Sequence, residues 1–295
     1  MAKRRALRRY TWFDWFNIVF MSLFCFITLF PIWYVLVGSF NEGLDYTMGG
    51  VWFWPRVWTL DNYLVVVTDA AIWKGYLVTI GRTVIGTITS VVFTSVVAYA
   101  VSRRNLRGRK VYYWIFMFTM FFGGGIIPYF ILLKTIGLLN NFLVYVVPSL
   151  FSAYNMIVIS VFFAQLPDSL CEAARIDGAG EYRILFTIVM PLSKPILSTV
   201  ALWSIVGHWN SYLDSMYYVN DPDLYSLQYV LMRIINKSSV PTNPGVTLPP
   251  SLYETITAKT VSFAAIIVST IPVLACYPFL QKYFASGFMV GAVKE

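Results

Sequence analysis

Residues 16–38 read FNIVFMSLFCFITLFPIWYVLVG, a run without a single charged side chain. An α-helix needs about 20 mostly apolar residues to cross the hydrocarbon core of a bilayer, so this run is long enough to span a membrane. Five further runs are similar, and the six predicted spans are 16–38, 76–101, 111–133, 142–164, 195–219 and 261–284. Because an isolated strand cannot satisfy its backbone in lipid, we expect helices and an all-α polytopic membrane protein.

The composition of the whole chain agrees with this fold class. Of the 295 residues, 58% are hydrophobic and only 12% are charged, and the mean hydropathy is +0.66. A soluble domain has about 45–50% apolar and about 25% charged residues. A soluble enzyme, a disordered protein and a nucleic-acid-binding protein therefore do not fit. One histidine and three widely separated cysteines favour neither a metal site nor a disulfide framework.

The distribution of basic residues predicts the orientation in the membrane. Most of the 22 lysines and arginines lie in the N-terminal tail, between spans two and three, between spans four and five, and after span six. Cytoplasmic loops carry an excess of basic residues, so both termini are predicted to be cytoplasmic. The first apolar run is longer than the usual 7–15-residue core of a signal peptide and no A-x-A site follows, so we expect it to be a retained helix.

One cytoplasmic stretch is too strongly patterned to be a simple connector. Residues 166–191 read LPDSLCEAARIDGAGEYRILFTIVMP. Pro167 favours the start of a helix, and Asp177-Gly178 favours a turn that ends it. A second helix is expected to start near Gly180 or Glu181 and to end before Pro191. Such a helix pair on the membrane surface would form a compact protrusion to which another protein could bind.

This stretch resembles the EAA loop of ABC importer permeases, and we call residues 166–191 the EAA segment. The family pattern is E-A-A, three residues, G, nine residues, I, one residue, L-P. Glu172-Ala173-Ala174, Gly178, Ile188 and Pro191 stand at these spacings, with Met190 where leucine is usual. The resemblance implies that the residues coupling this chain to an ATPase are Glu172, Ala173, Ala174, Asp177, Gly178 and Pro191.

Other stretches are similar to the MalG-like permeases of carbohydrate importers. They are FGGGIIP at 122–128, LKTIGL at 133–138, Trp209-Asn210, and the tail segments 277–284 and 291–295. A narrower similarity, to the smaller permease subunits of alginate-importing ABC transporters, implies a polyuronate substrate. No P-loop is present, so Gly123-Gly124-Gly125 is interpreted as a helix-packing site or a helix break.

The resemblance implies a complete set of partners in a bacterial inner membrane. They are a homologous second permease, two cytoplasmic ABC ATPases, an extracytoplasmic substrate-binding protein and a carbohydrate substrate. The chain itself would be a transmembrane subunit rather than an enzyme and would hold no cofactor, because ATP and magnesium would bind the partner ATPases. We expect membrane lipid around the chain and no nucleic acid among its partners.

Polar residues within the spans are candidates for the transport pathway. They are Arg82, Asn155, His208, Trp209, Asn210 and Asp214. Polar groups inside a span usually face a bundle interior or water. They would either contact the sugar or form hydrogen bonds with the partner permease. Arg82 would either line the pathway or extend to the outer interface.

The long outer segment before the last span is proline-rich. By similarity to MalG-like permeases it would contact the binding protein, through Ser239, Pro241, Asn243, Gly245 and Thr247. The alternative is a simple connector. For the whole chain, the alternative function is a secondary transporter or channel that works without an ATPase. That class needs its own coupling-ion site, and the spans lack an acidic pair.

Overall fold

The computed structural model describes residues 11–236 and 255–292. Within these ranges the chain is helical, and the β-structure is limited to one isolated antiparallel bridge between Asn41 and Trp58. This confirms the expected all-α class. The chain divides into two compact units, Met1–Thr68 with Ile234–Val268 and Asp69–Arg233 with Ser269–Glu295.

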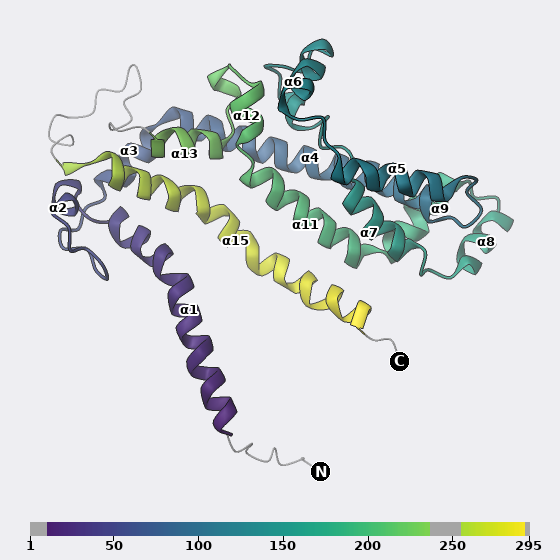
Figure 1. Cartoon of the computed structure of the whole chain (residues 1–295), viewed down its shortest axis with the longest axis horizontal. Coiled ribbons are helices and arrows are strands. Elements are labelled where there is room, and N and C mark those ends of the chain that lie inside the picture. Colours follow the sequence, from purple (N-terminus) through teal and green to yellow (C-terminus); the bar gives the residue numbers. More distant parts are fainter. Residues whose placement is uncertain (1–10, 237–254, 293–295) are drawn as a thin grey trace. The chain divides into compact units, whose positions relative to one another are not determined.

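Figure 1 shows the helices of both units, coloured along the chain. The first unit contains α1 (Trp12–Ser39), α2 (Gly43–Thr47) and α3 (Asp61–Thr68). The second contains α4 (Ala70–Ser102), α5 (Arg109–Phe121), α6 (Ile126–Thr135), η1 (Phe142–Tyr145), α7 (Ala153–Phe163), α8 (Asp168–Ile176), α9 (Glu181–Ile184), η2 (Leu185–Val189), α10 (Met190–Leu192), α11 (Lys194–Asn210), α12 (Leu213–Tyr218) and η3 (Pro222–Leu224). Two more helices, α13 (Leu227–Asn236) and α15 (Ala258–Ala292), have residues in both units.

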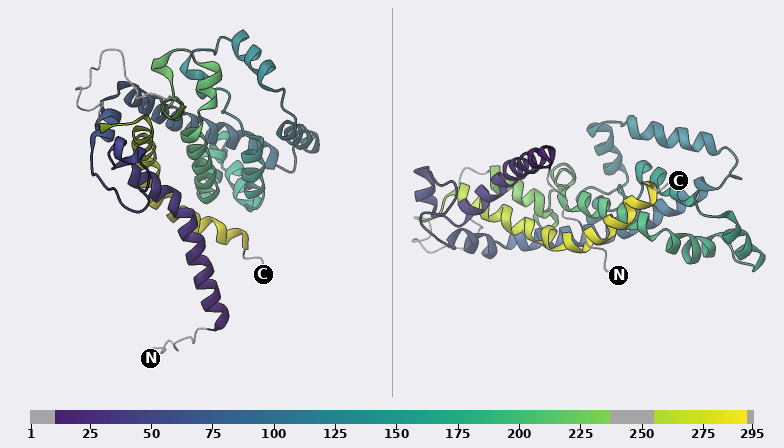
Figure 2. Two further views of the ribbon diagram at one scale, coloured as in Figure 1. Left: turned by 60° about the vertical axis from the view of Figure 1, so that its left-hand side comes forward. Right: turned by 90° about the horizontal axis from the view of Figure 1, so that it is seen from below.

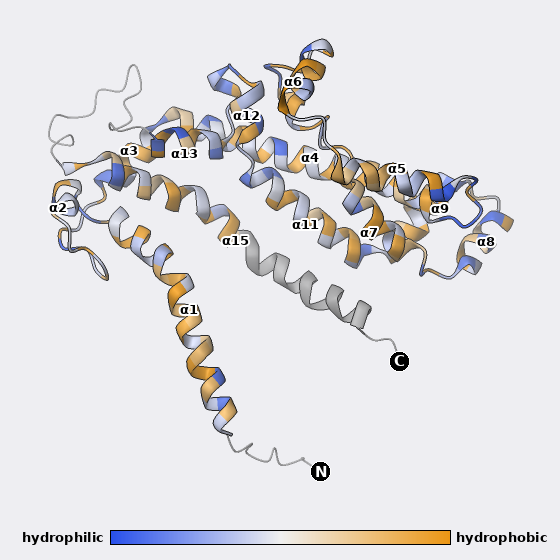
Figure 3. Ribbon diagram, in the orientation of Figure 1, coloured by the Kyte–Doolittle hydropathy of each residue, from blue (hydrophilic) through white to orange (hydrophobic). Residues whose placement is uncertain are grey.

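Helix α1 is mostly hydrophobic along its length (Figure 3), and most of its residues are exposed except near its C-terminal end. Its 28 residues extend over about 42 Å at 1.5 Å per residue, more than the roughly 30 Å hydrocarbon core of a bilayer. A helix that is apolar all round needs an apolar solvent or partner on every face. The exposure of α1 is therefore that of a helix surrounded by lipid or by another membrane subunit.

Two buried asparagines fix the segment that follows α1 in the first unit. The side-chain oxygen of Asn41 accepts hydrogen bonds from the backbone N–H of Arg56, at 2.7 Å, and of Val57, at 3.3 Å. The amide of Asn62 donates to the carbonyls of Ser39 and Asn41. Both asparagines are completely buried, so their hydrogen bonds hold residues 39–62 in one conformation.

Helix α4 is the element on which the second unit packs. Helices α7 and α11 lie along it, and α5 lies beside α7 (Figures 1 and 2). Small residues permit this close approach, because a Cβ added at Gly86 of α4 would lie 2.5 Å from Nε2 of His208 in α11. The largest core cluster combines side chains of α4, α7, the EAA segment and α11, namely Ala98, Tyr99, Val101, Met156, Ile159, Phe163, Cys171, Ile184, Leu185, Val189, Leu197 and Val200.

Three of the predicted spans are divided in the structure. Residues 111–133 form α5 and α6, with a 112° bend at the glycine run. Residues 142–164 form η1 and then α7, and residues 195–219 form α11 and α12. Helix α5 ends at Phe121, and Gly125, the residue before α6, has φ +84°, a positive value that suits glycine.

By length and composition, three described helices can cross a membrane: α1, α4 and the Ala258–Ala275 part of α15. The number rises to as many as six if each bent helix pair is counted as one span. The bent pairs are α5 with α6, α7 with α8, and Glu181–Leu192 with α11.

The contact between α4 and α11 gives a prediction about stability. Gly86→Ala places its Cβ against the His208 ring, and such overpacking typically costs about 1–3 kcal/mol. We expect the variant to lose its monodisperse form in detergent at a lower temperature than the parent chain. Gly81→Ala is the matched control, because its Cβ would lie 3.4 Å from the nearest atom, on Phe142. Equal thermal stability of the two variants would contradict this account of the packing.

Candidate functional site

The EAA segment forms a helix, a tight turn and an irregular second helix. Helix α8 ends in a Schellman motif, in which the N–H of Ala179 donates to the carbonyl of Ala174 and the N–H of Gly178 to that of Arg175. Gly178 occupies the left-handed position of this motif with φ +81°. A glycine is required here for its backbone conformation rather than for space, since nothing lies within 4 Å of an added Cβ.

The second helix runs further than the sequence predicts. It begins at Glu181, passes through the π-helical turn η2, and continues through Pro191 to Leu192. The expectation that it ends before Pro191 is therefore wrong. Proline lacks an N–H and its ring crowds the carbonyl four residues earlier. The π turn just before Pro191 is a known way to accommodate such a break in the hydrogen-bond ladder.

Helix α8 buries one side and exposes the other. Cys171 is buried in the core cluster, and Ala174 packs against that cluster. On the other side Glu172 and Ala173 are exposed, and Ile176 is 86% exposed. Within the described residues, Glu172 makes no hydrogen bond or ion pair. This helix therefore presents a small apolar surface with one unpaired negative charge.

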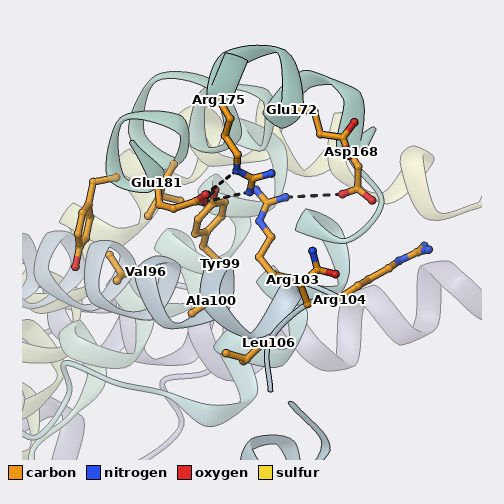
Figure 4. Close-up of a pocket in the computed structure, with 13 residues that line it drawn as sticks. Val96, Tyr99, Ala100, Arg103, Arg104, Leu106, Asp168, Glu172, Arg175 and Glu181 are labelled. Atoms are coloured by element: carbon orange, nitrogen blue, oxygen red, sulfur yellow. Dashed lines mark hydrogen bonds and ion pairs between the residues drawn. The ribbon is translucent and has the colours of Figure 1, made fainter. Parts of the chain in front are cut away.

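Glu181 connects three helices beneath this exposed surface (Figure 4). Its carboxylate accepts a hydrogen bond from the Tyr99 hydroxyl of α4 at 2.6 Å and one from Arg175 Nε of α8 at 2.7 Å. Arg175 and Tyr99 lower the pKa of the Glu181 carboxyl, with the Arg175 hydrogen bond as the larger cause. The carboxylate therefore stays ionised at neutral pH and keeps both charge-assisted bonds.

Arg103, just beyond the end of α4, contacts α4 and α8. Its guanidinium lies 4.2 Å from the Tyr99 ring centroid, donates to Cys171 Sγ at 3.1 Å, and lies 3.8 Å from a carboxylate oxygen of Asp168. Between α4, α8 and α9 is an open cavity of about 820 Å³ (Figure 4). Glu172 is one of its lining residues, together with Arg103 and Arg104.

Four of the six candidate pathway residues line a second cavity of about 410 Å³ in the second unit. They are Arg82, Asn155, His208 and Asp214. The other two do not line this cavity. Trp209 is buried, with its ring 6.4 Å from that of Tyr76, whereas Asn210 is exposed.

Arg82 is a buried arginine that forms an ion pair with the partly exposed Asp214. It is 2% exposed, donates to Asp214 Oδ2 at 2.7 Å and lies 4.4 Å from the centroid of the Tyr145 ring. In the structure the Arg82 side chain is directed to Asp214 and Tyr145 and does not extend to the surface of the chain. The sequence contains a signal for this pair, because Asp214 is the sole acidic residue in the six predicted spans and a charge inside a membrane usually has a partner.

Sequence reasoning did not find Tyr99, Arg103 or Glu181. Tyr99 and Glu181 are 82 residues apart in the chain, and each looks ordinary in its own segment. The proposed contact residues Ser239, Pro241, Asn243, Gly245 and Thr247 lie outside the described residues. Among those described, no group of three or more His, Cys, Asp or Glu side chains could hold a metal ion.

Comparison with known proteins identifies the family of this helical chain. The sequence pattern of the family "Binding-protein-dependent transport system inner membrane component" matches residues 90–290. Protein LplC of Bacillus subtilis (strain 168) is 35% identical over 96% of this chain and 95% of its own length. A second relative from the same organism is the polygalacturonan/rhamnogalacturonan transport system permease protein YtcP. It is 36% identical over 96% of this chain and 98% of its own length.

A solved structure has the same fold. One chain in the crystal structure of a bacterial ABC transporter involved in the import of the acidic polysaccharide alginate superposes with a TM-score of 0.84 and is 33% identical. The match covers 93% of this chain and 99% of that chain. These relatives confirm the expectation of a transporter subunit rather than an enzyme. The chain is therefore a permease subunit that belongs to the family of binding-protein-dependent transport system inner membrane components.

Proposed function

We propose that the EAA segment is the part of this permease that docks on a cytoplasmic ABC ATPase. The observation that carries the proposal is the exposed surface of α8, with its small side chains and an unpaired Glu172 above a packed core. Ala173 lets a partner approach closely, and Glu172 offers a carboxylate for a basic residue of that partner. An unpaired charge at the centre of an interface would give the docking direction and specificity.

In this proposal the chain works with three partner chains in the membrane complex and with a separate substrate-binding protein. A second, homologous permease encloses the pathway with it, and two ATPases bind ATP and magnesium. The binding protein delivers the substrate from outside, through contacts that include residues 236–251. ATP binding closes the ATPase pair, and the α8 helices transmit this closure so that the permease opens outward.

The membrane arrangement in the proposal has six spans with both termini in the cytoplasm. The helices available for these spans are α1, α4, α5 with α6, η1 with α7, α11 with α12, and α15. Non-helical backbone at membrane depth is tolerated where protein or a water-filled cavity surrounds it. The breaks in spans three to five would then lie toward the pathway rather than toward lipid.

The proposed substrate class is an oligosaccharide, and within it an acidic one. YtcP is named for polygalacturonan and rhamnogalacturonan, and the structural relative for alginate, so both are associated with uronic acid polymers. The cavity that contains Arg82 and Asp214 would be part of the pathway in this chain. Since Asp214 compensates the charge of Arg82, we attribute to this cavity hydrogen bonding to sugar hydroxyls rather than attraction of carboxylates.

The docking proposal is tested by reversing one charge. Glu172→Lys should reduce the ATPase that co-purifies with the tagged chain by about tenfold or more, because removing a partner from a buried charge pair typically costs about 2–5 kcal/mol. Membrane insertion should stay intact. Arg107→Glu is the control, since it reverses an exposed charge outside the EAA segment. Normal ATPase recovery with Glu172→Lys would refute the assignment.

The turn of the EAA segment gives a second prediction. Gly178→Ala forces an alanine into a left-handed conformation, which costs about 1–2 kcal/mol. Trypsin sites at Arg175 and Arg183 flank the turn, so we expect cleavage there to become about fivefold faster or more. Gly180→Ala is the matched control, because Gly180 has φ −73° and open space around it. Cleavage of Gly178→Ala at the parental rate would contradict the role given to this turn.

The Arg82–Asp214 pair gives a third prediction. Asp214→Asn leaves the buried Arg82 without its charged partner, and because Asp214 itself is 37% exposed we expect a cost below the roughly 3–5 kcal/mol of a fully buried pair. Arg82→Met combined with Asp214→Asn removes both charges, so we expect this double variant to be more stable than Asp214→Asn alone and to retain the ATPase.

Transport by the double variant tests the pathway assignment. Uptake of a labelled alginate oligosaccharide or oligogalacturonide into proteoliposomes containing the whole complex should fall, because the polar cavity lining has changed. Uptake at the parental rate would mean that the pair has only a structural role and that the pathway lies elsewhere.

A further inference from the structure

The exposed helix α8 is attached to the long helix α4 by directional polar contacts as well as by apolar packing. Glu181 lies at the junction, where its two carboxylate oxygens are within hydrogen-bond distance of groups on α4 and α8. The two closest contacts, at 2.6 and 2.7 Å, are in the range of charge-assisted hydrogen bonds. A third contact, from Arg175 to the other oxygen at 3.4 Å, makes the arginine side chain approach in a forked geometry.

The other contacts between α8 and the bundle restrict its position less. Cys171 and Ala174 pack into the core cluster, but apolar contacts are non-directional and permit small shifts. The pair between Arg103 and Asp168 is longer, at 3.8 Å, and the Asp168 side chain is 66% exposed. The Arg175–Glu181 pair is also partly exposed, at 43% and 55%, and exposed pairs contribute little to rigidity, so the bond to Glu181 from the buried Tyr99 is the firmer of its two short contacts. Arg103 also donates to Cys171 Sγ at 3.1 Å, but the two contacts of Glu181 are the shortest between these helices, at 2.6 and 2.7 Å, so Glu181 restricts the register between α8 and α4 most.

Helix α4 extends without a break from this junction toward the polar cavity of the second unit. Tyr99 contacts Glu181, and Arg82 of the same helix lines that cavity. The two residues are separated by about 25 Å at 1.5 Å per residue. Because α4 is one continuous helix of 33 residues without an internal proline, it offers a route by which a displacement at one end would reach the other.

We propose that Glu181 is a positioning residue that clamps α8 to the end of α4 through Tyr99 and Arg175, so that α8 and α4 move as one rigid body. This inference rests on the proposed function, because the movement would start with an ATPase docked on α8. Its consequence is that a displacement of the docking helix reaches the polar cavity through α4. Loss of the clamp would leave the ATPase docked while its movement is no longer passed on.

The test measures the distance between the two helices directly. Spin labels are placed on cysteines at Leu170 of α8 and Ile88 of α4, both exposed, in the full complex with native Cys25 and Cys276 replaced by serine. Electron–electron distance measurements are made without nucleotide and with ATP trapped by vanadate. The parental complex should give one narrow distribution that is the same in both states. Glu181→Ala should broaden the distribution and shift it between states, with the ATPase still co-purifying.

A functional readout accompanies the distances. The ratio of imported alginate oligosaccharide to ATP hydrolysed should fall by at least about fivefold in Glu181→Ala, the lower end of typical coupling between sites. Tyr99→Phe combined with Arg175→Gln removes the two donors to Glu181 and should lower the transport ratio in the same way. This double variant replaces Glu181→Ala if that variant fails to accumulate. Asp223→Asn is the control, since it breaks an exposed ion pair with Lys74 at the other end of α4.

Two results would overturn the clamp. One is an unchanged distance distribution in both clamp variants, and the other is a parental distance that differs between the two nucleotide states. Failure of the proposed function is a separate outcome, because no ATPase would then co-purify with the parental chain. In that case the distance distributions without nucleotide still decide whether Glu181 fixes α8 on α4.

Discussion

Close packing against the buried side of α4 is the constraint on which the second unit depends. That side carries small residues, and a methyl group added at Gly86 would overlap the His208 ring of α11. Small side chains let helices approach closely where lipid provides no hydrophobic driving force between them. Because α7, α11 and the EAA segment share one core cluster with α4, the position of each depends on that of the same helix.

The two candidate functional regions of the second unit lie at different positions along α4 and have different chemistry. Near its end, charged hydrogen bonds of Glu181 and Arg103 support an exposed helix that carries an unpaired carboxylate. Nearer the start of α4, the charge of the buried Arg82 is neutralised by Asp214 beside an open cavity. A chain that couples a docking site to a pathway needs both a free charge for its partner and compensated charges inside. The distribution of charge in this unit meets both needs.

Much of this arrangement could be predicted from the sequence. The apolar runs predict helices because lipid allows few other structures. The spacing from Glu172 to Pro191 predicts the helix pair of the EAA segment between the fourth and fifth spans. The glycine run at 123–125 is interpreted from the sequence as a helix-packing site or a helix break, and the structure has the break. The divisions of 142–164 and 195–219 were harder to predict, since neither run contains a comparable glycine cluster. Tyr99 and Glu181 could not be paired from one sequence, because neither residue type is unusual where it stands. The pairing of Arg82 with Asp214 was accessible, because no other acid lies in the predicted spans.

The central claim is that α8 docks this permease on an ATPase. The most direct measurement is purification of the tagged, unmodified chain from its native membrane in mild detergent, followed by mass spectrometry of the proteins that accompany it. We predict stoichiometric recovery of a second permease and an ABC ATPase. Recovery of the chain alone, with oligosaccharide transport that persists in liposomes without ATP, would contradict the account and favour a secondary transporter.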